Sequence, residues 1–310
     1  MSLVTVSHLT KKFSTHTAVD DLSFSVEEGD VYGFLGQNGA GKSTTIRMLL
    51  TLITPTTGHI ELFGLDLRKE RNKILRQVGA VIEKPDLYKY LSAYENLSLF
   101  ARMSGLKISK KELQDQLEMV GLAGREKDRV KTFSQGMKQR LGIAVALIHD
   151  PRLIILDEPT NGLDPQGIAD MRNLILHLSR HLRKTIIVSS HMLHEIEQIS
   201  TRMLIIDQGK KMVEGNVESL MDPAKTRVEV QTNDPGAAAH LLESSEWFPF
   251  LQKITGDGLI FQLPKEKIPA LNRAMVQLQI NVLSIQAKTS LEAYFLSLTR
   301  SKQHVAPYTD

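Results

Sequence analysis

The chain has 310 residues, 42% apolar and 24% charged, which is long enough for about two ordinary globular domains. Its net charge is +3 and its basic and acidic residues are interleaved, so we expect no nucleic-acid partner. The absence of cysteine excludes disulfides, thiolate metal sites and cysteine nucleophiles.

Two further features concern the membrane. The N-terminal residues show neither a basic region nor an apolar core, so no signal peptide is expected. No apolar run approaches the roughly 20 residues that a membrane-spanning helix needs. If the protein works at a membrane, another chain is expected to span it.

The first 66 residues are typical of strands and turns. Residues 22–26 alternate between apolar and polar, as in a half-exposed strand, and residues 28–30 form a turn. Residues 31–35 form an apolar run that indicates a buried strand, and a further strand is expected at 59–63.

A glycine-rich segment follows the strand at 31–35. Residues 36–43, the phosphate loop, read Gly-Gln-Asn-Gly-Ala-Gly-Lys-Ser and match G-x-x-x-x-G-K-[S/T]. Backbone N–H groups of such a loop converge on phosphates, Lys42 reaches the β- and γ-phosphates, and Ser43 ligates Mg²⁺. An ordinary turn before a helix is the alternative, which the flanking strand and helix disfavour. The predicted nucleotide-binding residues are Gly36, Gln37, Asn38, Gly39, Ala40, Gly41, Lys42, Ser43 and Thr44.

Residues from about 92 to 150 have a helical pattern, with Leu113, Leu117, Val120 and Leu122 near helical spacing. Residues 133–137, the signature segment, place a serine and a glycine at the start of one of these helices. Free N–H groups, a hydroxyl and the positive end of the helix dipole favour an anion there. Serine before a helix is equally a common N-cap, so this segment alone supports both interpretations.

Buried parallel strands are indicated by short apolar runs at 153–156 and 185–188, with a further strand at 204–206. The first run ends in Asp157 and Glu158. Asp157 can hold Mg²⁺ at the strand tip, and Glu158 can take a proton from an attacking water. A merely solvated acidic end is the alternative, which the following residues 159–164 disfavour. The sequence predicts an α/β domain with a mixed sheet, an antiparallel N-terminal part and a helical insertion.

Composition and rhythm change near residue 221. The pattern predicts strands at 227–232, near 251, at 259–263 and at 282–285, and helices at 236–243, 266–278 and 290–299. The first six elements suit a ferredoxin-like β-α-β-β-α-β unit. We therefore predict a nucleotide-binding domain at 1–220 and a small accessory α+β domain at 221–310.

The order and spacing of five segments resemble those of the ATP-binding subunits of ABC transporters. They are residues 36–43, 133–137, 153–158, 160–164 and 189–191, and the resemblance covers about residues 1–220. It implies an ATPase in which two copies face each other. Each ATP then lies between the phosphate loop of one copy and the signature segment of the other.

Roles for single residues follow from this resemblance. Ser134 and Gly136 would contact the γ-phosphate bound to the partner subunit, Glu158 would be the catalytic base, and His191 would position the γ-phosphate and the water. Asp164 would link the two sites across the dimer. Phe13 matches the aromatic residue that stacks on adenine, although a lone aromatic in this position is also commonly part of a core.

Two features depart from the family pattern. The signature segment reads Phe-Ser-Gln-Gly-Met, which keeps the serine and the second glycine of the common Leu-Ser-Gly-Gly-Gln. Glu83 stands where most relatives have glutamine; its carboxylate can still ligate Mg²⁺. This variant, with residues 87–88, 94–97 and 290–295, resembles the branch of exporter ATPases that serves bacitracin and lantibiotic self-protection.

The resemblance also implies partners. A separate transmembrane permease would hold a homodimer of this subunit at the cytoplasmic face of the membrane, with ATP and Mg²⁺ bound. Residues 83–99 would contact the permease, with Tyr88, Leu91 and Tyr94 as either docking anchors or core residues. A soluble ATPase of the same superfamily, acting as an assembly factor, is one alternative. A regulator that binds ATP without hydrolysis is another, which Glu158 and His191 disfavour.

Overall fold

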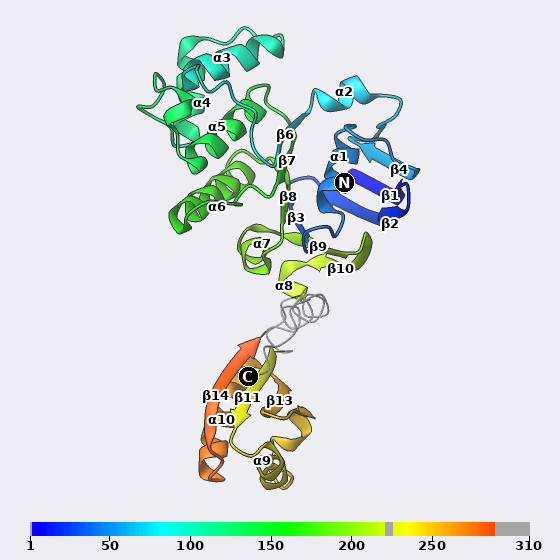
Figure 1. The fold of residues 1–310 in the computed structure, drawn as a ribbon, viewed down its shortest axis with the longest axis vertical. Helices are drawn as coiled ribbons and strands as arrows, with labels where there is room; N and C mark the ends of the chain where they lie inside the picture. Colours follow the sequence, from blue (N-terminus) through cyan, green and yellow to red (C-terminus); the bar gives the residue numbers. More distant parts are fainter. Residues whose placement is uncertain (1, 221–225, 289–310) are drawn as a thin grey trace. The chain divides into compact units, whose positions relative to one another are not determined.

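Figure 1 shows a computed structural model of the chain, which describes residues 2–220 and 226–288. The chain divides into two units, residues 1–215 and 216–310. This division lies close to the boundary predicted after residue 220. None of the helices in the described ranges combines the length and the apolar character needed to cross a membrane.

The first unit begins with an antiparallel sheet, as predicted. Strands β1 and β2 pair from Ser2↔Glu27 to Phe13↔His16, and burial alternates along both strands. The apolar face of this sheet enters the main core of the unit because alternate side chains point to one side. The strand order is β2-β1-β4-β5, formed by β1 (Ser2–Phe13), β2 (His16–Glu27), β4 (Thr57–Leu62) and β5 (Leu65–Asp66).

A second sheet forms the centre of this unit. Every residue of β3, β7 and β8 is buried, which explains their continuous apolar runs. Neighbouring strands are parallel from β9 through β3, β8 and β7 to β6. The order is β10-β9-β3-β8-β7-β6, formed by β3 (Val31–Leu35), β6 (Val78–Ile82), β7 (Leu153–Asp157), β8 (Thr185–Ser190), β9 (Arg202–Asp207) and β10 (Lys210–Asn216).

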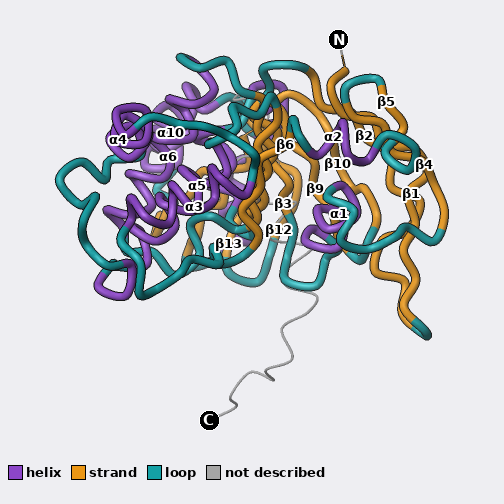
Figure 2. Tube along the Cα trace, turned by 90° about the horizontal axis from the view of Figure 1, so that it is seen from above, coloured by secondary structure: helices purple, strands orange, loops and turns teal. Residues whose placement is uncertain are grey.

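Helices gather mainly on one side of this central sheet. In both Figures 1 and 2, α3 to α6 lie on one side of its strands and the N-terminal sheet lies on the other. The helices of the unit are α1 (Lys42–Leu49), α2 (Arg71–Leu75), α3 (Ala93–Met103), α4 (Lys110–Met119), the 3-10 turn η1 (Val130–Thr132), α5 (Gln135–Leu147), α6 (Pro165–Arg180) and α7 (Leu193–Ile199).

Local sequence signals fix where several of these helices begin. Ser92 and Glu95 form a capping box at α3, in which each side chain bonds the other's backbone N–H. The backbone N–H of Ser92, bonded to Glu95, lowers the pKa of that carboxyl. Asp164 caps α6, and Pro165 occupies its first helical position.

The helical insertion is less continuous than predicted. Helix α4 ends at Met119, and Val120 and Leu122 lie beyond it although both are buried. Gly121 follows with a φ of 69°, a left-handed conformation that ends the helix. The apolar spacing identified core residues correctly, but it could not show that the last two sit on a turn.

The second unit has the predicted ferredoxin-like arrangement. Its sheet order is β12-β13-β11-β14, and all three pairs are antiparallel. Phe261, Trp247 and Leu271 belong to its separate core. The elements are α8 (Val217–Leu220), β11 (Thr226–Thr232), α9 (Pro235–Leu242), η3 (Phe248–Phe250), β12 (Leu251–Ile254), β13 (Gly258–Leu263), η4 (Lys265–Lys267), α10 (Ile268–Gln277) and β14 (Val282–Lys288). The helix predicted at 290–299 lies outside the described residues.

Candidate functional site

The carboxyl ends of four parallel strands meet at one edge of the central sheet. Ile82 of β6 pairs with Asp157 of β7, Asp157 pairs with Ser189 of β8, and Ser190 pairs with Leu35 of β3. The residues that follow these ends are Glu83, Glu158, His191 and the phosphate loop. Open α/β sheets bind ligands at this edge, and the register therefore brings the predicted residues together.

The phosphate loop joins β3 to α1, and two of its glycines permit close backbone packing. Gly41 caps α1 with a φ of 109°, and an added Cβ would lie 2.6 Å from the carbonyl oxygen of Ala18. A Cβ on Gly36 would lie 2.4 Å from the carbonyl oxygen of Ile206. Other residues would push the loop off the sheet, so these glycines define the shape that presents N–H groups at the start of α1.

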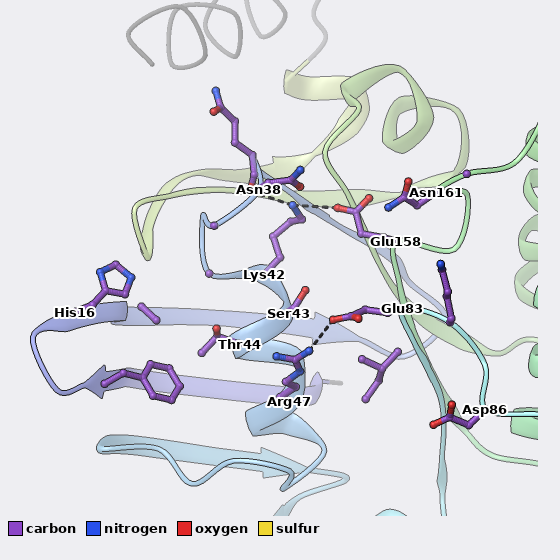
Figure 3. Close-up of a pocket in the computed structure, with 18 of the residues that line it drawn as sticks. His16, Asn38, Lys42, Ser43, Thr44, Arg47, Glu83, Asp86, Glu158 and Asn161 are labelled. Carbon is purple, nitrogen blue, oxygen red and sulfur yellow. Dashed lines mark hydrogen bonds and ion pairs between the residues drawn. The ribbon is translucent and has the colours of Figure 1, made fainter. Parts of the chain in front are cut away.

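Lys42 is the first residue of α1 and is 5% exposed. Its ammonium donates to the carbonyl oxygens of Gly36 at 2.6 Å and Gln37 at 3.2 Å, and it lies 3.1 Å from Oε1 of Glu158. Figure 3 shows this side chain pointing from the helix toward Glu158. The carboxylate therefore supplies the anionic partner that a phosphate would supply in a nucleotide complex.

Glu158 is held from two sides. Its Oε2 lies 2.8 Å from Nδ1 of His191, and the whole side chain is 14% exposed. Because an ionised carboxylate only accepts, Nδ1 of the imidazole donates this bond and Nε2 is its second polar atom. Glu158 also has a φ of 50°, which is unusual for a residue with a side chain and typical of functional turns.

Ser189 orders the two acidic residues at the tip of β7. Its hydroxyl donates to Oδ1 of Asp157 at 2.6 Å and accepts from the backbone N–H of Glu158 at 2.8 Å. Oδ2 of Asp157 is buried and has no hydrogen-bond partner among the described residues. A buried carboxylate oxygen of this kind suits a hard divalent cation, so Asp157 and the hydroxyl of Ser43 fit Mg²⁺.

An open cavity of 1320 Å³ surrounds the phosphate loop. Phe13 lies on its wall at the end of β1, 45% exposed, with Nζ of Lys11 4.9 Å from its ring centre. The alternative that Phe13 belongs to a core is therefore wrong. The lining comprises Phe13, His16, Ala18, Gln37, Asn38, Gly39, Gly41, Lys42, Ser43, Thr44, Arg47, Ile82, Glu83, Lys84, Asp86, Gln135, Glu158, Asn161 and Gly162.

Seven predicted site residues lie outside this lining: Gly36, Ala40, Asp157, His191, Ser134, Gly136 and Asp164. The last three lie at the starts of α5 and α6. Ser134 caps α5, and its hydroxyl accepts from the backbone N–H of Met137 at 3.2 Å. Asp164 caps α6 in the same way, accepting from the N–H of Gly167 at 3.0 Å. Gly136 is half-buried in the first turn of α5. Within a single chain these residues act as caps and a turn, and the cavity receives only their neighbour Gln135.

Glu83 makes an ion pair that the sequence analysis did not predict. Its Oε1 accepts from Nη2 of Arg47 at 2.6 Å, and both side chains line the cavity. Figure 3 shows Arg47 and Ser43 projecting from the same helix toward Glu83. Both residues belong to α1, so the ion pair of Arg47 links the loop after β6 to the phosphate-binding helix.

A second missed residue is Glu195 of α7. Its Oε2 accepts from the hydroxyls of Thr160 at 2.8 Å and Ser190 at 2.7 Å. It thereby joins the loop after β7 to the last residue of β8, which directly precedes His191. An acidic residue in a short helix that contains a second one, Glu197, gave no signal of this role.

Comparison with known proteins adds to this geometry. The family model described as ABC transporter matches residues 19–161. The bacitracin transport ATP-binding protein BcrA of Bacillus licheniformis is 44% identical, over 96% of this chain and 97% of the relative. This chain belongs to the ABC transporter ATP-binding proteins. As a member of that family it is an ATP-hydrolysing subunit of a transporter.

Other members of the family differ in extent. The lantibiotic transport ATP-binding protein SrtF of Streptococcus pyogenes is 41% identical, over 68% of this chain and 90% of the relative. A structure of the ATP-binding cassette MJ0796, described as a dimeric post-hydrolysis state with ADP and Pi, has a TM-score of 0.62 and 25% identity. It covers 69% of this chain and 98% of that one. The ABC fold predicted for the first unit is therefore confirmed.

Proposed function

We propose that this ABC ATPase powers an exporter that confers resistance to a peptide antibiotic, of the bacitracin type or a lantibiotic. The main support is the match to BcrA over 96% of the chain, which necessarily includes most of the second unit. SrtF matches 68% of the chain, so its alignment leaves about a third of the residues without a counterpart. The full-length match to BcrA therefore makes bacitracin the first substrate to test.

ATP and Mg²⁺ are the proposed ligands of the cavity. Ser43 and Asp157 would hold Mg²⁺, which would neutralise charge on the phosphates. Lys42 would exchange the carboxylate of Glu158 for the β- and γ-phosphates. Glu158, oriented by Nδ1 of His191, would then accept a proton from the attacking water.

Two copies of the chain would complete each site. Ser134 and Gly136 lie at the N-terminus of α5, where N–H groups and the helix dipole favour a phosphate. We assign them to the nucleotide of a second copy, as the resemblance to ABC ATPases implies, because within their own chain they form a helix cap and a first turn. Asp164 would face the same interface. A homodimer would then contain two equivalent sites.

A separate permease would hold this dimer at the cytoplasmic face of the membrane. Tyr88 and Tyr90 follow Glu83 and are both exposed, whereas Leu91 and Tyr94 are half-buried. The ring of Tyr88 also packs against Phe100, 6.1 Å between centres. We therefore propose Tyr88 and Tyr90 as anchors for the permease, with Leu91 and Tyr94 supporting them.

Purification from membranes tests this function. We expect the tagged chain, extracted with detergent, to co-purify with an integral membrane protein. Loss of the chain should sensitise cells to bacitracin several-fold, and Lys42→Ala should fail to restore resistance. Recovery of the chain without any membrane protein would instead favour a soluble ATPase. Unchanged sensitivity to bacitracin with altered sensitivity to a lantibiotic would assign the other substrate.

Phe13→Ala should weaken nucleotide binding by about fivefold, since stacking of a base on an aromatic ring is worth roughly 1 kcal/mol or more. Phe13 is 45% exposed, so the variant should retain its melting temperature. Titration with a fluorescent ATP analogue measures the change. Phe248→Ala is a matched control because Phe248 is 42% exposed and lies in the other unit. Equal affinities for Phe13→Ala and wild type would remove Phe13 from the adenine site.

A further inference from the structure

Two neighbouring strands of the central sheet end in glutamates with the same unusual backbone. Glu83 follows β6 with a φ of 56°, and Glu158 follows β7 with a φ of 50°. Their surroundings differ. Glu158 is 14% exposed and lies against Lys42 and His191. Glu83 is 62% exposed, and it pairs with the guanidinium of Arg47.

Arg47 lies next to the proposed metal ligand on α1. It is four residues beyond Ser43, and residues four apart on a helix are neighbours on one face, with Cβ atoms about 5–6 Å apart. Both side chains line the cavity, and Figure 3 shows them on the side of α1 that faces Glu83. A fixed positive charge therefore stands beside the place where Ser43 and Asp157 fit Mg²⁺.

The carboxylate of Glu83 can therefore interact with either of two cations, the guanidinium of Arg47 or a Mg²⁺ bound by Ser43 and Asp157. A glutamine at this position could ligate Mg²⁺ through its amide oxygen, but it could not form an ion pair with Arg47. Exposed ion pairs are weak because water and salt screen them. A divalent cation with its own carboxylate and hydroxyl ligands is therefore able to displace the guanidinium.

We infer that Arg47 is a positioning residue that holds Glu83 in the nucleotide-free chain and competes with Mg²⁺ for its carboxylate. This inference rests on the proposed function. Mg²⁺ with ATP releases Glu83 from Arg47, and the segment that begins at Glu83 changes its attachment to α1. In this chain the charge of Glu83 makes the attachment depend on the metal.

A double-mutant cycle tests the competition without measuring turnover. The dissociation constant of a fluorescent, non-hydrolysable ATP analogue is measured with EDTA and with excess Mg²⁺. The magnesium ratio is the value with EDTA divided by the value with excess Mg²⁺. Arg47→Gln should raise this ratio about two- to fivefold more in the chain with Glu83 than in the Glu83→Gln background, as expected for one exposed ion pair. Arg47→Lys keeps the positive charge and should stay close to wild type.

The double-mutant cycle separates the interaction between Arg47 and Glu83 from the general effect of removing a positive charge. Removal of Arg47 also weakens attraction for the phosphates, but that effect is present in both backgrounds and cancels. Arg125→Gln is a matched control, since Arg125 pairs with Asp128 at 2.9 Å in a similarly exposed setting outside the cavity. An equal change in both backgrounds would overturn the inference. A wild-type chain that fails to bind the analogue would overturn the proposed function itself.

Discussion

Glu158→Gln is expected to lower ATP turnover by about 10³-fold or more while nucleotide binding persists, because loss of a general base typically costs about 10²–10⁴-fold. In the nucleotide-free chain the carboxylate forms an ion pair with Lys42 and accepts a hydrogen bond from His191. An amide is neutral, so glutamine at this position could accept hydrogen bonds but could not form the ion pair with Lys42. In the variant no carboxylate competes with the phosphates for Lys42. ATP should therefore bind at least as tightly as in the wild type.

The closed dimer should also accumulate in this variant, since ATP binds and is not consumed. Single-turnover hydrolysis, titration with an ATP analogue and size-exclusion chromatography with ATP measure the three effects. Glu28→Gln is a suitable control because Glu28 is an exposed partner of Arg152 away from the cavity. A Glu158→Gln chain that hydrolyses ATP at the wild-type rate would remove Glu158 from its role.

The sequence predicted those site residues whose positions are set by the end of a buried strand. Apolar runs located β3, β7 and β8, and parallel strands necessarily present their carboxyl ends at one edge. Lys42, Asp157 and Glu158 could therefore be placed together before the fold was known. The ferredoxin-like order of the second unit was predictable for a similar reason, because its alternation of elements admits few right-handed topologies.

Contacts between side chains far apart in the sequence could not be predicted in this way. Arg47 and Glu83 are 36 positions apart, and the pair depends on the direction in which the loop after β6 turns. Glu195 accepts a hydrogen bond from Thr160, 35 positions away, and the residues around Glu195 form no motif that predicts this contact. Periodicity reports which face of an element is buried, but it carries no information on the rotamers that join two loops.

Gly136→Asp is expected to reduce turnover at least about 100-fold without loss of stability, since electrostatic contacts to a transition state are commonly worth 10²–10³-fold each. An added Cβ at Gly136 has its nearest contact at 3.9 Å, to Cδ2 of Leu163, so a side chain fits. An acidic residue in the first turn of α5 also suits the helix dipole. The new carboxylate should therefore repel the phosphates bound to the partner copy, and this repulsion should lower turnover.

Folding and single-chain binding should be unchanged, and thermal unfolding with analogue titration tests both. Gly136→Asn is the matched control: it has the size of aspartate without the charge, and should retain more turnover than Gly136→Asp. Wild-type turnover in Gly136→Asp would place α5 outside the catalytic site.

Mixing two inactive variants distinguishes a shared site from a site within one chain. A dimer of one Gly136→Asp copy and one Glu158→Gln copy has one site with the intact Glu158 of the first and the intact Gly136 of the second. Its other site carries both defects. Equal mixing makes about half of the dimers mixed, so turnover should recover to at most about a quarter of wild type. If each site used the α5 of its own chain, every site in the mixture would carry one defect, and no activity would return.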